Sequence, residues 1–429
     1  MTPSPRTAED LARFIEASPS PFHCVDTAAS RLRAAGFEAH QRTDAPAPMA
    51  PGSGGFLEEA GTLLAWRTGT DAPAEAGFRI ILAHTDSPNL RLKPAPEYDK
   101  EGYRMWGVEK YGGLLLATWT DRDLGLSGRV GVRVDGGVET RLVRIDRPLA
   151  RVPNLAIHLN RGVNTDGLVL NPETQMAAMI GLAGGDEPGA LTRLLATEAG
   201  CEPEALLDWE LGLHDTQAPT IGGLNGDFVF GARMDNQFSC YAALQALIDA
   251  PVSRGTSVVA LFDHEEVGSL SARGARSVLL RNLLRQIERD HEERVPGGLE
   301  RALAHSFMVS ADMAHGVHPG FADKHTARLK PMMNGGVVIK TNANVRYVSD
   351  SLSASTFRAI CQDNEVPVQD FVNRTDLACG STVGPSTAAQ LGVSTVDVGC
   401  AMLSMHSARE QAGAEDVGHF CRALMGVFG

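Results

Sequence analysis

A strand-like run in the middle of the chain ends in four ionisable residues, and these residues are well placed to do chemistry. Residues 258–262 have the length and β-branched content of a buried strand, and the stretch DHEEVGS follows at once. In open α/β sheets, ligands bind at the carboxyl ends of the strands. Two adjacent glutamates, Glu265 and Glu266, are costly to bury in their ionised form unless a cation offsets them. A bound metal would do so, and the alternative is a solvated loop with a chance acidic pair.

A second strand-like run, residues 78–83, ends in the stretch HTDSP. His84 and Asp86 are two positions apart, so both side chains project from one face if the strand continues. An aspartate can then orient an imidazole that binds a metal. The pair can equally be structural, and this motif alone leaves both interpretations open.

Three further ionisable residues lie next to the ends of predicted strands or helices. Asp235 precedes a helical pattern, although it could instead cap that helix. Asp312 follows a predicted strand at 307–309, and His406 follows one at 393–399, where it could equally be a polar loop residue. Together with the two motifs above, these residues form the ligand set for two zinc-type ions that share one bridging carboxylate. Imidazole and carboxylate without thiolate suit Zn²⁺, Co²⁺ or Mn²⁺ at a hydrolytic centre, so no redox site is implied.

The strands and helices expected around these residues indicate an α/β fold. We predict a mixed central sheet flanked by helices and an inserted β-rich domain. From about residue 92 to 231 the pattern changes to alternating runs such as 128–134, and only one helix, at 189–198, is convincing. We therefore predict a discontinuous catalytic domain, residues 1–91 and 232–429, and an inserted β-rich domain, residues 92–231.

Other patterns set expectations for particular segments. Amphipathic spacing predicts helices at 25–35, ending at Gly36, and at 275–290. His158 lies within the insertion in the stretch NLAIHLNR, whose alternation predicts a half-buried strand. In such a strand the histidine would be an ordinary structural residue.

Composition limits the possible functions. The chain has 429 residues, 43% of them hydrophobic, and a net charge of −13, which repels phosphate backbones and anionic lipid. We therefore expect neither nucleic acid nor membrane as a partner. No apolar run approaches the ~18–20 residues that span a bilayer, and no secretory signal begins the chain, so a cytoplasmic location is expected. The 7 cysteines include no CxxC pair and are expected to be core residues.

The chain resembles the aspartyl aminopeptidases, which are di-zinc exopeptidases, over essentially its whole length. The motifs that carry the resemblance are SPSPFH (18–23), HTDSP (84–88), RMDNQ (233–237), DHEEVGS (263–269), DMAHGVHP (312–319), IKTN (339–342) and MHSARE (405–410). Their order and spacing make the combination specific. The resemblance implies an inserted β domain that drives assembly into a homo-oligomer, typically a tetrahedral dodecamer.

The resemblance also implies a role for each residue at the predicted junctions. It implies two zinc ions per subunit, and the ligand chemistry leaves cobalt or manganese as alternatives. Their ligands would be His84 and Asp312 for one ion, Glu266 and His406 for the other, and Asp235 as the bridge. Glu265 would be the general base for a hydroxide that bridges the metals, and Asp86 would orient His84.

Substrate selection is assigned to a separate group of residues. An acidic amino-terminal side chain requires a cation, and Lys340, at a predicted strand end, is the candidate that the resemblance also favours, although a surface lysine is the alternative. By the same resemblance, His158 would reach into a neighbouring subunit and stabilise the oxyanion of the reaction. His315 and Tyr347 are further candidates for the pocket. The expected substrates are peptides that begin with Asp or Glu.

Other functions remain compatible with the same residues. A related di-zinc amidohydrolase of acylated amino acids shares the ligands but needs a carboxylate clamp in place of amine recognition. An aminopeptidase of broader specificity is a further alternative. A non-enzymatic cage that retains the fold for assembly is a remote alternative, because every expected ligand and the base are present.

Overall fold

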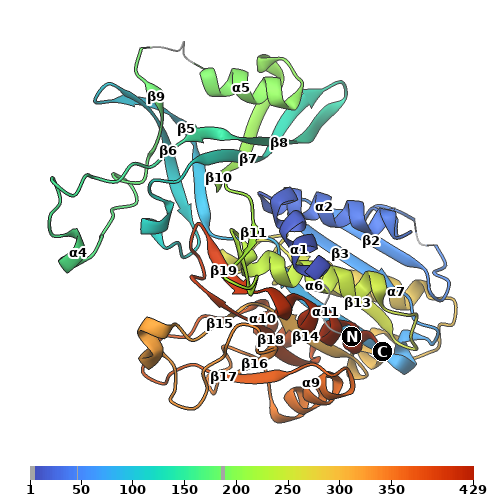
Figure 1. Ribbon diagram of the computed structural model, residues 1–429. Helices are drawn as coiled ribbons and strands as arrows, with labels where there is room; N and C mark the ends of the chain where they lie inside the picture. Colours follow the sequence, from blue (N-terminus) through green and yellow to red (C-terminus); the bar gives the residue numbers. More distant parts are fainter. Residues whose placement is uncertain (1–4, 46, 185–188) are drawn as a thin grey trace. The chain divides into compact units, whose positions relative to one another are not determined.

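The computed structural model describes residues 5–45, 47–184 and 189–429 (Figure 1). The chain packs as two compact units. The larger unit contains the residues up to Asp86, Pro219–Met405 and Glu410–Gly429, and the smaller unit contains Ser87–Ala218 and His406–Arg409. The smaller unit is thus formed mainly by one long segment inserted between two parts of the larger one.

A mixed sheet forms the centre of the larger unit, and thirteen strands within the described residues belong to it. In order across the sheet, its main path is β1 (Glu38–His40), β2 (Gly54–Glu59), β3 (Thr62–Arg67), β13 (Thr256–Phe262), β4 (Phe78–His84), β14 (Phe307–Ala311), β18 (Ser394–Leu403), β19 (Glu410–Gly413), β12 (Phe228–Gly231) and β11 (Thr220–Gly222). Three more strands join beside β18, namely β15 (Ala314–His315), β16 (Val337–Thr341) and β17 (Val368–Val372).

Four neighbouring strands of this sheet are parallel, and their carboxyl ends lie at one edge. Strand β4 pairs in parallel with β13 on one side, where His84 lies opposite Phe262. On its other side β4 pairs in parallel with β14, which in turn pairs in parallel with β18. The residues that follow β4, β13 and β14 therefore emerge side by side, as the strand-end argument requires.

Helices cover both faces of the sheet (Figure 1). One face packs against α1 (Pro5–Ala17), α2 (Pro21–Ala34), α6 (Met234–Asp249), α9 (Ser351–Asp363) and α11 (Ala414–Phe428), and the other against α7 (Leu279–Asp290), α8 (Gly298–Ala304) and α10 (Val383–Leu391). The short helix α3 (Pro73–Ala76) precedes β4. Along β4, Ile81 and Ala83 join the first core and Ile80 and Leu82 the second, because side chains alternate across a strand. The predicted fold class, a mixed sheet between helical layers, is confirmed.

The smaller unit is built on an antiparallel sheet. Its six strands run in the order β8 (Gly137–Ala150), β7 (Leu124–Val134), β10 (Leu206–Asp215), β5 (Asn89–Lys100), β6 (Tyr103–Tyr111) and β9 (Ala178–Leu182). Helix α5 (Ala190–Ala199) inserts Leu191 and Leu195 into its core. Shorter pieces are η1 (Leu116–Trp119), α4 (Val163–Asp166) and η2 (Pro203–Ala205). The predicted domain boundaries and the assembly role of the insertion stay predictions.

Several local expectations differ from the structure. The predicted strand around His158 is wrong, because residues 153–160 form a turn and irregular chain, and His158 is exposed. None of the strands in the described residues pairs with this segment, so the alternation alone does not make a strand. Helix α2 begins at Pro21, earlier than predicted, because the Ser20 side chain accepts a hydrogen bond from the His23 backbone N–H and a proline occupies its first turn. Helix α7 begins only at Leu279.

Two further expectations are that the cysteines are core residues and that no segment spans a membrane. All seven cysteines are free thiols, and four of them are buried. Within the residues described, no helix combines the length and the apolar character needed to cross a bilayer.

Candidate metal centre

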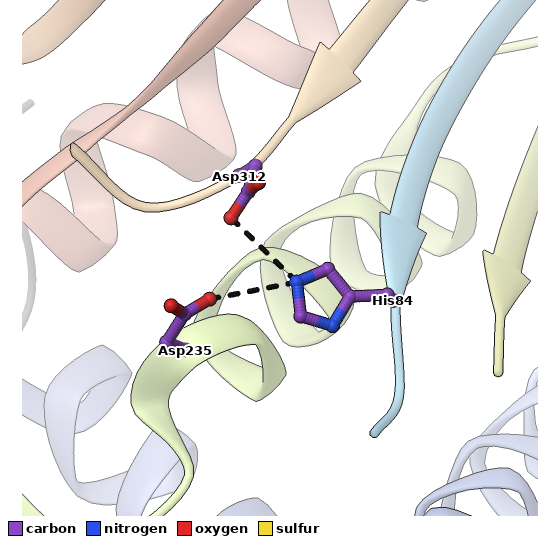
Figure 2. A group of neighbouring side chains, drawn as sticks. All are labelled: His84, Asp235 and Asp312. Carbon is purple, nitrogen blue, oxygen red and sulfur yellow. Dashed lines mark ion pairs between the residues drawn. The ribbon is translucent and has the colours of Figure 1, made fainter. Parts of the chain in front are cut away.

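His84 lies at the end of β4 and is almost fully buried (1% exposed). Its Nε2 atom lies 3.5 Å from Oδ1 of Asp235 and 3.7 Å from Oδ1 of Asp312 (Figure 2). The two carboxylates come from different parts of the chain, one from the start of α6 and the other from the loop after β14. Three residues predicted as metal ligands are thus brought together at the carboxyl edge of the sheet.

The imidazole of His84 is held from behind by Asp86. Its Nδ1 atom lies 2.9 Å from the backbone carbonyl oxygen of Asp86 and 3.5 Å from the carboxylate Oδ1 of the same residue. Burial lowers the pKa of His84, but the carboxylates of Asp235, Asp312 and Asp86 outweigh burial and raise this pKa well above its usual value. Of the two contacts that Asp86 makes with the His84 ring, the closer one comes from its main-chain carbonyl oxygen.

The carboxylate of Asp86 also contacts a second segment of the site. Its Oδ1 and Oδ2 atoms accept the backbone N–H groups of Glu265 and Glu266, each at 3.1 Å. One aspartate therefore contacts both the histidine at the end of β4 and the glutamate pair after β13. This second contact joins two strand ends that are neighbours in the sheet.

Asp235 is held at the start of α6 by two other elements. Its backbone N–H donates to Oε2 of Glu410 at 3.1 Å, and the Asn236 side chain donates to the carbonyl of Ala311 at 2.8 Å. Arg233 occupies the N-cap position, and Asp235 itself has non-helical backbone angles (φ −84°, ψ 100°). Asn236 is non-helical as well (φ −126°, ψ 26°), so α6 is kinked at these two residues, and the Asp235 carboxylate lies beside His84.

Asp312 directly follows β14, and its main chain contacts a buried lysine. Lys340, on β16, is 1% exposed and donates from Nζ to the carbonyls of Asp312, at 2.8 Å, and Met313, at 3.3 Å. Its ammonium also lies 5.1 Å from the centre of the Tyr347 ring. The alternative of a surface lysine is therefore wrong, because Lys340 lies inside the protein beside a candidate metal ligand.

Glu265 and Glu266 belong to the 3-10 turn η3 (Glu265–Val267), which Asp263 and His264 connect to the end of β13. A ligand atom of His84, one of Glu265 and one of Glu266 lie within 4.8 Å of one another. Burial raises the pKa of Glu265 well above its usual value, and the carboxylates of Asp312, Glu266 and Asp86 add to this while His84 opposes it. A carboxyl group with a raised pKa beside candidate ligands suits proton transfer.

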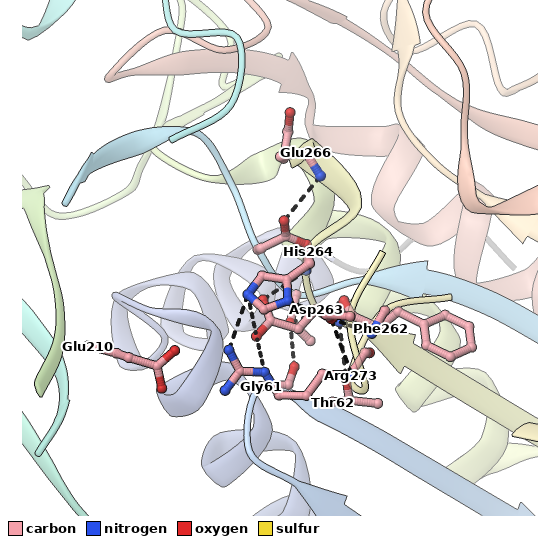
Figure 3. A network of polar contacts seen from close by, with 12 residues as sticks. Gly61, Thr62, Glu210, Phe262, Asp263, His264, Glu266 and Arg273 are labelled. Atoms are coloured by element: carbon pink, nitrogen blue, oxygen red, sulfur yellow. Dashed lines mark hydrogen bonds and ion pairs between the residues drawn. The ribbon is translucent and has the colours of Figure 1, made fainter. Parts of the chain in front are cut away.

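A polar network lies behind this turn (Figure 3). Its side chains are Thr62, Asp263, His264, Ser271 and Arg273. Sequence reasoning placed Asp263 and His264 in the charged cluster without giving them a role, and it missed Arg273 and Glu410. The position of Glu410 in the MHSARE motif was a usable signal, whereas nothing in the sequence marks Arg273.

The remaining predicted site residues lie in several places. His406, in the smaller unit, has Nδ1 2.9 Å from the carbonyl oxygen of Gly113. His158 lies in an exposed turn of the same unit. His315 is on β15 with its ring 5.9 Å from that of Phe371, and Tyr347 is buried with its ring 6.2 Å from the same phenylalanine. Phe371 therefore lies beside both candidates for the pocket.

The donor set fits a divalent cation. Ligand atoms of His84, Asp235 and Asp312 lie within 4.8 Å of one another, and all three residues are buried. Carboxylates gathered in a buried place repel one another unless a cation offsets them. Imidazole nitrogen with carboxylate oxygen is the ligand chemistry of zinc at hydrolytic sites.

A mixed sheet between helical layers, with such a cluster at the carboxyl edge of its parallel strands, defines the class of α/β metal-dependent hydrolases. The chain belongs to the family described as aminopeptidase I zinc metalloprotease (M18), which matches residues 14–428. It is therefore a hydrolase of the zinc-dependent aminopeptidase type.

Named relatives and solved structures agree with this family. The chain is 46% identical over 427 residues to a probable M18 family aminopeptidase 2 of Ectopseudomonas mendocina, covering 98% of this chain and 97% of that protein. It matches the structure of Chaetomium thermophilum mApe1 with a TM-score of 0.88 at 32% identity, over 99% of this chain and 97% of that one. It also matches the S. cerevisiae mApe1 dodecamer with a TM-score of 0.85 at 29% identity, over 98% of this chain and 96% of that one.

Proposed function

We propose that this protein removes acidic residues, Asp or Glu, from the amino terminus of peptides, using two divalent metal ions per subunit. The observation that carries the proposal is the buried group of His84, Asp235 and Asp312 at the carboxyl edge of the sheet. Family membership supports zinc and aminopeptidase chemistry. The number of ions, the roles of individual residues and the acidic specificity are our proposals.

His84 and Asp312 would hold one ion, Asp235 would bridge, and Glu266 with His406 would hold the other. Support for His406 comes from the chain itself. The backbone N–H of Asp235 donates a hydrogen bond to Glu410, and only three residues lie between Glu410 and His406. A chain of that length spans at most about 14 Å. This covalent tether limits the separation of Glu410 and His406, and our proposal assigns His406 to the second ion.

Glu265 is the proposed general base and proton carrier. When bound, the ions supply Lewis-acid polarisation of the scissile carbonyl and lower the pKa of the attacking water. Glu265 takes the proton from that water and passes it to the leaving amine. Its neighbour Glu266 is needed as a ligand, which accounts for the adjacent pair. Asp86 holds His84 through its carbonyl and the glutamate turn through its carboxylate.

Lys340 is the proposed determinant of acidic specificity. Its ammonium is fixed by two carbonyls beside Asp312, so little side-chain freedom remains to be lost when a substrate carboxylate approaches. The low-dielectric surroundings of a buried cation strengthen its attraction for an anion. His315 and Tyr347, which flank Phe371, would contribute to the same pocket.

The proposed active form is a homo-oligomer in the cytoplasm, assembled through the inserted domain, 92–231, beside a catalytic domain of 1–91 and 232–429. The matched S. cerevisiae mApe1 structure is a dodecamer, which supports the same number here. Leu155, Ile157 and Leu159 flank His158 and are 59%, 46% and 75% exposed. Apolar side chains exposed together are typical of surfaces that bind another protein. His158 would then reach the active site of a neighbouring subunit.

The experiment that tests this proposal compares chromogenic amides of Asp, Glu, Leu and Lys, with and without a chelator. We expect hydrolysis of the Asp and Glu amides that the chelator abolishes and that added Zn²⁺, Co²⁺ or Mn²⁺ restores. Equal rates on Leu and Asp amides would replace acidic specificity by a broader aminopeptidase. Hydrolysis of N-acetyl-aspartate instead would identify an amidohydrolase, because such an enzyme does not require a free amine on its substrate.

A further inference from the structure

We propose that Arg273 is a positioning residue for the glutamate pair, acting through His264 and Asp263. The inference rests on the proposed function, because it assigns no new reaction and concerns how Glu265 and Glu266 are held. It follows from contacts of the loop 263–274, which belongs to the larger unit (Figure 3).

His264 is the residue directly before the glutamate pair, and both of its ring nitrogens have partners. Its backbone is left-handed, with φ +65°, a conformation that histidine adopts more readily than most residues. Nε2 lies 3.1 Å from Nη2 of Arg273, and Nδ1 lies 2.7 Å from Oγ of Ser271. A guanidinium only donates hydrogen bonds, so Nε2 accepts and the ring proton is on Nδ1, facing Ser271. The arginine therefore fixes both the orientation and the tautomer of the ring.

The other side of the guanidinium faces a fully buried carboxylate. Nε of Arg273 lies 3.3 Å from Oδ2 of Asp263, whose other oxygen accepts the backbone N–H of His264 at 2.9 Å. Asp263 is 0% exposed, so the guanidinium supplies the positive charge that a buried carboxylate requires. The planar fork of arginine reaches the carboxylate and the imidazole together, which the single ammonium of a lysine does less well.

The main chain of Arg273 is anchored to the neighbouring strand end. Oγ1 of Thr62 donates to the carbonyl of Arg273 at 2.6 Å and accepts the backbone N–H of Asp263 at 3.0 Å. There is no space for a larger residue at Gly61, because a Cβ atom there would lie 2.3 Å from Oδ2 of Asp263. The arginine is thus attached to β3 as well as to the residues that precede the glutamates.

These contacts hold the glutamate turn in addition to those made by Asp86. The carboxylate of Asp86 binds the amides of Glu265 and Glu266, while Arg273 fixes the residue immediately before them. The turn is closed by the backbone N–H of Ser269, which donates to the carbonyl of His264 at 2.7 Å. With both ends fixed, Glu265 can serve as proton carrier and Glu266 as ligand without exchanging places.

The test replaces Arg273 by glutamine or lysine in the full-length protein and measures kcat, KM and zinc affinity by chelator competition. Positioning residues around metal ligands typically contribute 10- to 100-fold to affinity or activity. For Arg273→Gln we expect kcat and the affinity for one of two zinc ions to fall by about 10-fold or more, with KM within about threefold. Arg273→Lys should recover part of both losses. The visible spectrum of the cobalt-loaded variant should also shift, because one ligand changes its geometry.

The matched control is Arg276→Gln, an exposed arginine three residues after Arg273 whose Nε contacts only Oγ of Ser386 among the interactions of the described residues. Arg276→Gln should match the wild-type protein in kcat, KM, zinc affinity and cobalt spectrum. Wild-type values of kcat, zinc affinity and cobalt spectrum in Arg273→Gln would overturn the inference. If that variant does not fold, His264→Asn decides by the same measurements, because asparagine tolerates the left-handed backbone but cannot reach both partners. If the wild-type protein itself has no metal-dependent aminopeptidase activity, the proposed function is refuted instead.

Discussion

The Nζ atom of Lys340 lies 2.8 Å from the carbonyl oxygen of Asp312, so a fully buried ammonium contacts the main chain of a proposed zinc ligand. On the adjacent strand β18, Asp397 lies directly opposite Lys340 in the antiparallel register. Burial raises the pKa of Asp397, and the lysine charge opposes that increase. The lysine therefore has two possible contributions, one to the shape of the metal site and one to the selection of substrate.

Replacing Lys340 separates these contributions. For Lys340→Met we expect the ratio of kcat/KM for Asp amide over Leu amide to fall by about 100-fold or more, because the pocket loses its cation. Lys340→Arg keeps the charge and should retain part of the preference. The measurement is kcat/KM on both amides together with zinc content.

The opposite result is equally informative. A loss of zinc with an unchanged ratio of the two substrates would make Lys340 a support for the Asp312 loop alone. Acidic specificity would then need another cation. The conservative arginine variant guards against a general loss of folding, since it preserves the buried charge opposite Asp397.

Replacing Glu265 by glutamine tests the division of labour between the two glutamates. Glutamine cannot take a proton from water, so we expect kcat to fall by about 10²- to 10⁴-fold while zinc content stays near that of the unchanged protein. The companion variant Glu266→Gln should lose zinc affinity instead. Metal analysis and steady-state kinetics on both variants decide this, and a loss of zinc in Glu265→Gln would show that the two roles are reversed.

Replacing His158 by alanine tests whether neighbouring subunits share an active site. If His158 stabilises the oxyanion from a neighbour, kcat should fall by about 100-fold with the assembly intact. Light scattering checks the assembly, and mixing His158→Ala subunits with Glu265→Gln subunits should restore part of the activity. Unchanged kinetics would remove His158 from the site, which suits its exposed position in a turn.

The strand pattern of the sequence predicts the fold and brings several candidate residues together. Runs of apolar residues mark β4, β13 and β14, and because these strands are parallel neighbours, their carboxyl ends meet. The cluster of His84, Asp235 and Asp312 follows from this rule together with the helix start at 234. Alternation alone failed around His158, since a strand also needs a partner and residues 153–160 pair with no strand in the described part of the chain.

Contacts that depend on loop conformation could not be predicted from the sequence. The Asp86 carboxylate reaches the amides of Glu265 and Glu266 only because η3 turns back toward β4. Likewise, the contact between Arg273 and His264 requires the left-handed backbone at His264 and the fold of the whole loop. Spacing along the chain carries no signal for either arrangement. The burial of Lys340 depends on the position of β16 beside β18, which the motif does not reveal.

A final prediction concerns the dependence of stability on pH, far from the metal centre. Asp10 of α1 and Arg31 of α2 form two hydrogen bonds, at 2.7 and 3.1 Å. Burial tends to raise the pKa of Asp10, but Arg31, together with hydrogen bonds from Tyr241 and Arg13, outweighs burial and lowers this pKa below 3.8. The pair therefore stabilises the folded state above the unfolded pKa, and the contribution is lost as pH falls through the folded pKa.

Replacing Asp10 by asparagine should lower the free energy of unfolding at pH 7 by less than about 1 kcal/mol, because the pair is partly exposed to solvent. At pH 3 the difference from the unchanged protein should shrink, since the aspartate then becomes protonated, first in the unfolded chain. Thermal unfolding at pH 7, 4 and 3 measures it, with Asp26→Asn as the exposed control on α2. A difference that stays constant over this range would mean that Asp10 contributes by packing, and that its charge has no part in joining α1 to α2.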